Sequence, residues 1–332
     1  MADAEKIGRA ARRAIRAKLD GHQVVMVVSA MGHATDELVN LANQVNPNPP
    51  KREMDMLLTT GEQISIALMA MAISAAGHEA IRFTGGQVGM VTNDAHTKAR
   101  IRSIDAARIH RELNAGKVVI VAGFQGVTEG GAITTLGRGG SDTTAVALAA
   151  ALKADVCEIY TDVDGVYTTD PRIVPKASKM NTVSYDEMLE LASLGAGVMH
   201  SRSIEFGKKY NVPIHVRSSL TDTQGTMIVS EDQGMERIVV RGVTLKRDLA
   251  RVVLVGVPNK TGIAAQIFAR VAEHNIVVDD IIQNIYEHGK EANIGFTTSG
   301  ADAREAKTLC EKLVKEIGLR GVEVDDKVAK VS

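Results

Sequence analysis

Residues 134–147 read TTLGRGGSDTTAVA, in which three glycines surround Arg138 and a helical run begins at Thr143. Glycine lets a backbone turn sharply and approach a ligand closely. Ser141 or Asp142 is expected to cap the following helix, whose first amides and dipole favour a bound anion. The guanidinium of Arg138 suits a carboxylate or a phosphate. The stretch therefore predicts a loop that holds a small anionic group, although a strand-to-helix turn without any ligand has the same local pattern.

The composition excludes several classes of protein. The chain has 332 residues, enough for two or three domains, and 45% of them are hydrophobic. Its 39 Lys and Arg balance 40 Asp and Glu, so no net charge attracts nucleic acid or a membrane surface. No apolar run is long enough to span a membrane. Cys157 and Cys310 lie far apart in apolar patterns, which predicts buried thiols in a cytoplasmic protein. The histidines, His96 and His200 among them, lack metal-ligand spacing and are interpreted as surface or satisfied polar positions, so no metal site is predicted.

Short apolar strands alternate with helices through the first two thirds of the chain. The predicted strands are 24–28, 80–84, 118–122, 156–161 and 213–216, and the predicted helices are 2–19, 37–43 (capped by Thr35 or Asp36), 54–76, 106–114, 143–153, 185–192 and 199–210. Continuous apolar runs at 24–28, 118–122 and 156–161 predict buried parallel strands. The short turns predict a mainly parallel sheet with helices on both faces, and ligands bind such sheets at the carboxyl ends of their strands.

Glu62 stands out in the long helix 54–76. It follows Gly61, which breaks the apolar pattern, and precedes an almost wholly apolar run. A charge in such a place has to be paired or functional. The alternative is a first-turn carboxylate stabilised by the helix dipole.

The pattern changes after a boundary at 224–234. Strands are predicted at 249–257, 279–286, 291–297 and 322–324, with helices at 263–274 and 303–317. This βαββαβ order is the ferredoxin-like split unit. Residues 327–332 are predicted to begin another strand.

Several motifs, taken together and in this order, resemble those of the aspartate kinases in the amino-acid kinase family. They are SAMGHATDEL (29–38), EMDMLLTTGEQIS (53–65), VAGFQG (121–126), TTLGRGGSDTTA (134–145) and YTDVDGVYTTDPR (160–172). The resemblance covers essentially the whole chain and implies an α/β fold, a three-layer sandwich with a mainly parallel sheet. It assigns 1–230 to the kinase domain, 238–326 to an ACT domain, which resembles the ferredoxin-like unit, and 327–332 to the start of a second ACT domain.

The resemblance also implies an activity and a set of site residues. The activity is ATP- and Mg²⁺-dependent phosphorylation of the L-aspartate β-carboxylate, the first step towards lysine, threonine and methionine. The catalytic residues implied are Glu62, Arg138 and Asp142. Further substrate-binding residues are His33, Ala34, Thr35, Asp36, Glu37, Gly139, Gly140 and Ser141. The nucleotide site would comprise Ser29, Tyr160, Thr161, Asp162, Val166, Tyr167, Thr168, Thr169, Asp170, Pro171 and Arg172.

The ACT resemblance implies feedback regulation. Lysine or threonine would bind at Asn259, Thr261, Gly262, Ile263, Ala264, Asp280, Gln283 and Asn284, and two copies would pair through their ACT domains. The turn at 259–264 precedes a helix N-terminus, which independently suits an amino-acid carboxylate, although a plain strand-loop-helix connection has the same pattern.

Two departures from the family pattern affect these expectations. The family's first strand and its Lys-Phe/Tyr-Gly-Gly-Thr-Ser phosphate loop are not found in the chain, and Gly197 stands where many members have lysine. We therefore expect a chain truncated at both ends, with very low kinase activity and reduced stability. A kinase for another small acid, such as glutamate or acetylglutamate, and a non-catalytic effector-binding subunit are the alternative functions.

Overall fold

The computed structural model describes residues 3–194, 197–231, 242–274, 276–286 and 290–332. They form two compact units, Met1–Gly242 and Val243–Ser332. In the first unit the helices are α1 (Ala4–Leu19), α2 (Ala34–Val45), α3 (Lys51–Ala75), α4 (Ala107–Asn114), α5 (Gly140–Leu152), α6 (Tyr185–Ser193) and α7 (Ser201–Tyr210), with a short 3₁₀ turn η1 (Gly86–Val88). Its strands are β1 (Val25–Val28), β2 (Ala80–Phe83), β3 (Val91–Thr92), β4 (Ile101–Ser103), β5 (Val118–Ala122), β6 (Gln125–Thr128), β7 (Ile133–Thr135), β8 (Cys157–Thr161), β9 (Val166–Tyr167), β10 (Lys179–Met180), β11 (Thr182–Ser184), β12 (Ile214–Ser218) and β13 (Thr226–Val229).

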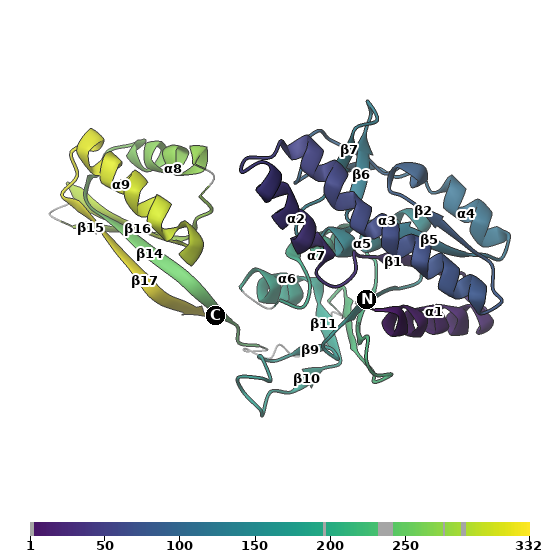
Figure 1. Ribbon diagram of the computed structural model, residues 1–332. Coiled ribbons are helices and arrows are strands. Elements are labelled where there is room, and N and C mark those ends of the chain that lie inside the picture. Colours follow the sequence, from purple (N-terminus) through teal and green to yellow (C-terminus); the bar gives the residue numbers. More distant parts are fainter. Residues whose placement is uncertain (1–2, 195–196, 232–241, 275, 287–289) are drawn as a thin grey trace. The chain divides into compact units, whose positions relative to one another are not determined.

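Three layers are built around β5, the central strand of the parallel sheet β1-β5-β2 (Figure 1). Every residue of β5 is buried, and successive side chains of a strand point to opposite faces. Val118 and Ile120 pack with α1 and α3, whereas Val119 and Val121 pack with α4 and α5. The predicted α/β fold, with helices on both faces of a parallel sheet, is confirmed.

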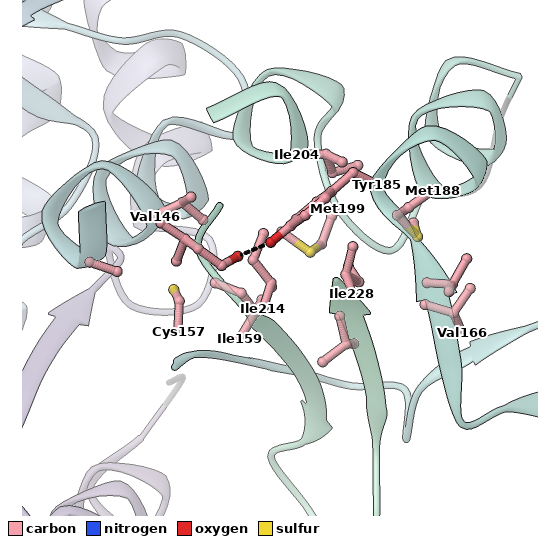
Figure 2. Packing of buried hydrophobic residues seen from close by; sticks show 14 residues of the cluster. Val146, Cys157, Ile159, Val166, Tyr185, Met188, Met199, Ile204, Ile214 and Ile228 are labelled. Atoms are coloured by element: carbon pink, nitrogen blue, oxygen red, sulfur yellow. Dashed lines mark hydrogen bonds between the residues drawn. The ribbon is translucent and has the colours of Figure 1, made fainter. Parts of the chain in front are cut away.

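A second sheet has the order β11-β13-β12-β8, with β12 parallel to β8 and antiparallel to β13. Its core, shown in Figure 2, joins these strands to α5, α6 and α7 through side chains such as Val146, Met188 and Ile214. The hydroxyl of Tyr185 donates to the Val212 carbonyl in this core at 2.5 Å. Two further sheets, β4-β3-β6-β7 and β10-β9, lie in the described part of the unit, and the β6–β7 hairpin leads into the glycine-rich loop.

The structure corrects some sequence predictions. β1 and β8 are edge strands and only partly buried, because each has one neighbour instead of two. The strand at 213–216 is not the last of the unit, since β13 follows within the predicted boundary segment. Helix α2 begins at Ala34, so Thr35 and Asp36 lie in its first turn and do not cap it.

The second unit is a four-stranded antiparallel sheet with the order β15-β16-β14-β17. Its elements are β14 (Leu245–Pro258), α8 (Ile263–Glu273), β15 (Asp279–Tyr286), β16 (Glu291–Ser299), η3 (Gly300–Asp302), α9 (Ala303–Ile317) and β17 (Gly321–Val331). Figure 1 shows α8 and α9 on one face of the sheet, where they bury a core with Val252 and Leu254. The predicted βαββαβ order is confirmed.

The end of the second unit differs from the prediction. Residues 327–331 do not begin a new strand but continue β17, and Val331 pairs with Leu245 of β14. The two strands run side by side past the helices, so the hydrogen-bonded ladder extends to the end of the chain.

Helix α3 is the one described helix that is long and apolar enough, by length and composition, to cross a membrane. Its packing identifies it as a core helix. It contacts α1 and α2 and carries the buried side chains of Asp55 and Glu62.

We expect Tyr185→Phe to lower the free energy of unfolding by about 1–2 kcal/mol, because the buried Val212 carbonyl loses its hydroxyl partner. Urea denaturation followed by circular dichroism measures this change. Tyr210→Phe is the matched control, since the Tyr210 side chain is half exposed. Equal effects of the two substitutions would contradict the assignment of the hydrogen bond to the core.

Candidate active site

Helix α3 runs without interruption through Gly61 and places Glu62 near its middle. A Cβ atom at position 61 would lie 2.9 Å from the Cβ of Ala30, so only glycine lets the helix pass this close to the segment after β1. Glu62 is 3% exposed and its Oε1 accepts a hydrogen bond from the Ala30 N–H at 3.1 Å. The first-turn interpretation of Glu62 is therefore wrong, and the helix dipole does not explain its position.

The second carboxylate oxygen of Glu62, Oε2, is buried and has no hydrogen-bond partner within the described ranges. Burial raises the pKa of Glu62 to about 7, against the smaller opposing effect of the Ala30 N–H. A buried acceptor of this kind is suited to an ammonium group, which would supply both the missing hydrogen bond and the opposite charge.

The glycine-rich loop holds Arg138 between two residues in the left-handed region, Gly137 (φ 78°) and Gly139 (φ 67°). A Cβ at Gly137 would lie 2.9 Å from the Thr97 carbonyl, and one at Gly139 would lie 2.2 Å from the Cβ of His200. Both glycines are therefore required by conformation and by close packing. Helix α5 begins at Gly140 with Gly139 as its N-cap and no side-chain cap. The prediction that Ser141 or Asp142 caps this helix is wrong, because both lie in its first turn.

These elements enclose a cavity of about 360 Å³. Its lining residues are Ser29, Ala30, Gly32, Thr35, Glu62, Phe124, Gly137, Arg138, Gly139, Gly140, Ser141 and Asp142. A second cavity of about 430 Å³ shares Arg138, Gly139 and Asp142 and is completed by Ala192, Gly197, Val198, Met199, His200 and Ser201. The three predicted catalytic residues thus lie together, and two of them face both cavities.

Charges of both signs surround the first cavity. Asp142 is partly exposed, and burial raises its pKa while a hydrogen bond from the His200 N–H lowers it. Arg138 supplies the positive charge, and Glu62 and Asp142 supply two acceptors. One guanidinium and two carboxylates in one cavity complement a small zwitterion that carries both a carboxylate and an ammonium group.

Of the predicted substrate residues at the start of α2, some line a cavity and others do not. Thr35 lines the first cavity, whereas His33 and Asp36 are exposed, with 3.7 Å between His33 Nδ1 and a carboxylate oxygen of Asp36. Ala34 and Glu37 occupy the same first turn without lining either cavity as described.

The predicted nucleotide residues other than Ser29 do not line these cavities. Thr161 ends β8, and the segment from Asp162 to Arg172 follows it and includes β9. The ring of Tyr160 lies under the guanidinium of Arg13, at 4.5 Å from its centroid, and its hydroxyl donates to Glu158. Arg172 donates to Asp170 at 2.8 Å. Residues 160–172 line neither of the two described cavities.

Several lining residues had no predicted role, among them Phe124 and His200. Phe124 has a positive φ of 70°, and its N–H donates to the Thr144 hydroxyl at 3.1 Å. Its position directly after a buried strand, within VAGFQG, was the available signal. His200 caps α7 and packs against Gly139, a tertiary contact without a local signal. The interpretation of His200 as a satisfied polar residue describes its hydrogen bond with the Arg202 N–H but not its place at the cavity.

The predicted effector residues divide between two elements of the second unit. Asn259, Thr261, Gly262, Ile263 and Ala264 form the turn from β14 into α8, with Gly262 at a φ of 92°. Asp280, Gln283 and Asn284 lie on β15. Asn284 pairs with Asn293 near the turn, whereas Asp280 lies toward the other end of β15 and its carboxylate contacts Lys330 Nζ at 2.6 Å.

Comparisons with known proteins agree with this fold. Residues 1–218 match the amino acid kinase family and residues 251–318 match the ACT domain. The chain is 51% identical to aspartokinase 2 of Bacillus subtilis over 328 residues, which is 99% of this chain and 80% of that protein. It is also 51% identical to an aspartokinase of Mycolicibacterium smegmatis over 337 residues, with 100% and 80% of the two chains covered.

Solved structures give the same result. Aspartokinase III of E. coli, in complex with aspartate and ADP, superposes with a TM-score of 0.78 at 26% identity, covering 99% of this chain and 84% of that one. An aspartate kinase from Synechocystis gives a TM-score of 0.63 at 43% identity, covering 99% of this chain and 57% of that one. The chain therefore belongs to the amino acid kinase family and, within it, to the aspartokinases.

The raised pKa of Glu62 predicts a pH-dependent stability. Ionisation of this carboxyl is disfavoured in the folded state, so its contribution to stability is greatest below the unfolded pKa of about 4.5 and is lost as the pH rises through about 7. Glu62→Gln cannot ionise and keeps an acceptor for Ala30. We expect it to raise the free energy of unfolding by up to about 3 kcal/mol at pH 8 but not at pH 4.

Urea denaturation of both proteins at the two pH values measures this difference. Glu53→Gln, an exposed acid in the first turn of α3, is the control and should have no such pH dependence. The same gain for Glu62→Gln at both pH values would show that the pKa of Glu62 is not raised.

Proposed function

We propose that this protein transfers the γ-phosphoryl group of ATP to the β-carboxylate of L-aspartate, giving 4-phospho-L-aspartate and ADP. The observation that carries the proposal is the cavity in which Arg138 stands with Glu62 and Asp142. Aspartokinase relatives at about half identity support the choice of substrate, as does the E. coli enzyme determined with aspartate and ADP.

The charges assign an orientation to the substrate. The guanidinium of Arg138 binds the α-carboxylate, and the ammonium group lies between Asp142 and the unpartnered oxygen of Glu62. The β-carboxylate then remains free to react. Three complementary charges in one cavity select an α-amino acid over a simple diacid, because a diacid would leave the buried carboxylates unpaired.

The transfer requires no general base. The β-carboxylate is already ionised at neutral pH, so its oxygen attacks the γ-phosphorus while the bond to the β–γ bridging oxygen breaks and ADP leaves. The difficulty is to bring one anion up to another. The site lowers this barrier by holding the two reactants in position. The first-turn amides of α5 and the positive charge of Arg138 also reduce the repulsion between the two anions.

We assign nucleotide binding to Ser29 and to residues 160–172. Magnesium, bound with the nucleotide, would neutralise phosphate charge. Within the described ranges no group of three or more His, Cys, Asp or Glu could hold a metal ion. Mg²⁺ usually binds through phosphates and one or two carboxylates, and Asp162, after β8, is an oxygen donor of this kind.

We also propose regulation by lysine or threonine at the second unit. The match to the ACT domain and the E. coli enzyme solved with lysine and aspartate support this assignment. Pairing of two copies through this unit is supported by β15, an edge strand on which Ile281, Ile282 and Ile285 are exposed. We assign residues 1–230 to the kinase domain and 238–326 to the ACT domain. Buried free thiols at Cys157 and Cys310 support a cytoplasmic location.

We expect Arg138→Lys to lower kcat/KM for L-aspartate by about 100-fold, because an ammonium group cannot form the two-pronged contact of a guanidinium. ADP release in a coupled assay with Mg-ATP and L-aspartate measures this loss. Arg102→Lys, at an exposed ion pair with Glu129, should leave turnover unchanged. Turnover by the parent chain of glutamate or acetylglutamate in place of aspartate would overturn the proposed substrate.

Regulation has its own test. L-lysine or L-threonine should raise the melting temperature, and Asp280→Asn should raise the effector concentration needed by about tenfold through loss of a charged partner. Asp326→Asn, at an exposed position on β17, is the control. If neither amino acid shifts the melting temperature, the effector assignment is wrong.

A further inference from the structure

A second buried carboxylate lies on α3. Asp55 is fully buried and stands seven residues before Glu62, about two helical turns away on the same face. Its oxygens accept hydrogen bonds from three groups: the Nδ1 of His96 at 2.6 Å, the N–H of Thr97 at 3.0 Å and the hydroxyl of Thr135 at 2.5 Å. The proposed chemistry uses none of these groups.

The contacts of Asp55 hold Thr97, within the segment 93–99, in a strained backbone conformation. Thr97 has a φ of 68°, in the left-handed region that β-branched residues rarely adopt. Such a conformation persists only where the surroundings enforce it. The Asp55 carboxylate does so, because it accepts the Thr97 N–H with both oxygens and pairs with the neighbouring His96.

The strained segment forms the wall behind the loop of Arg138. The Thr97 carbonyl occupies the space that a Cβ of Gly137 would need. The Arg202 guanidinium joins the two segments, because it donates to the Leu136 carbonyl and to the Ala99 carbonyl, each at 2.8 Å. The backbone just before Arg138 is thus tied to residues 97–99, which Asp55 ties to α3.

We infer that Asp55, together with His96, is a positioning group that sets where Arg138 stands relative to Glu62. Helix α3 then positions both charged groups that bind the substrate. Glu62 lies on α3 itself, and Arg138 is held in place relative to α3 through Asp55. The inference rests on the proposed function only in naming aspartate as the molecule bound between them.

Loss of Asp55 leaves the Thr97 N–H and the Thr135 hydroxyl without their buried acceptor. The backbone at Thr97 can then leave its strained conformation, and the backbone at Gly137 loses its contact with the Thr97 carbonyl. The consequence is selective. Binding of aspartate, which needs Arg138, weakens, whereas binding of ATP at residues 160–172 does not.

The experiment compares Asp55→Ala, His96→Ala and Asp55→Asn with the parent chain. Hydrogen–deuterium exchange reports on the amides of residues 136–140 without substrate, and steady-state kinetics give KM for L-aspartate and for ATP separately. Ser65→Ala is the control, because Ser65 is equally buried on α3 but donates within the helix, to the Gly61 carbonyl. His96→Ala keeps the test decisive if Asp55→Ala fails to fold, since the His96 side chain is 18% exposed.

We expect Asp55→Ala and His96→Ala to increase exchange at residues 136–140 and to raise KM for aspartate by about tenfold or more, with KM for ATP unchanged. Asp55→Asn keeps an acceptor for Thr97 and Thr135 and should restore most of the parent behaviour. Unchanged exchange at 136–140, or equal increases in both KM values, would overturn the inference. A parent chain that does not phosphorylate aspartate would refute the proposed function alone, because the exchange measurement would still decide the role of Asp55.

Discussion

The burial of two carboxylates on one helix is the constraint on which the rest of the site depends. Removing Asp55 and Glu62 from water is costly, so each must find partners in the surrounding chain. Glu62 is met by the segment after β1, and Asp55 by the 93–99 segment and β7. Helix α3 thereby gathers three distant segments, and the close approach at Gly61 fixes its distance from the first of them.

The backbone around Arg138 explains how a cavity with opposite charges can be stable. Within the part of the chain that the structure describes, Arg138 forms no hydrogen bond or ion pair with Glu62 or Asp142. Its backbone is held instead by two left-handed glycines, which pack against Thr97 and His200. Conformation, and not charge, therefore sets its place. This leaves the carboxylate oxygen of Glu62 available to a ligand, which an internal ion pair would have prevented.

The second unit has a well-packed core but an edge strand with exposed apolar side chains. Both helices cover one face of its sheet, and their core with β14 and β16 is complete within the unit. Its edge strand β15 instead exposes a row of isoleucines next to the polar side chains of Asp280, Gln283 and Asn284. In the regulation proposed above, this edge would present apolar area to a partner chain and polar groups to an amino acid.

Local sequence determined much of this protein. The all-apolar run of β5, the alternation of helices and strands and the βαββαβ order were predictable, because each depends on periodicity and turn residues close in sequence. The glycines around Arg138 likewise predicted an anion loop, and the motifs indicated the family. Glu62 could be singled out because a lone charge in an apolar helix is conspicuous.

Only the tertiary structure decided how these parts meet. The partial burial of β1 and β8 follows from their places at sheet edges, which strand pairing sets and composition does not. Helix α5 has no side-chain cap because its N-cap is Gly139, where a left-handed φ of 67° and the close approach of His200 exclude a larger residue. Asp55, His96 and Arg202 have no local signal, because their partners lie 41 to 103 residues away in the chain. Sequence thus determined which chemical groups are present, and long-range packing decided which of them share a cavity.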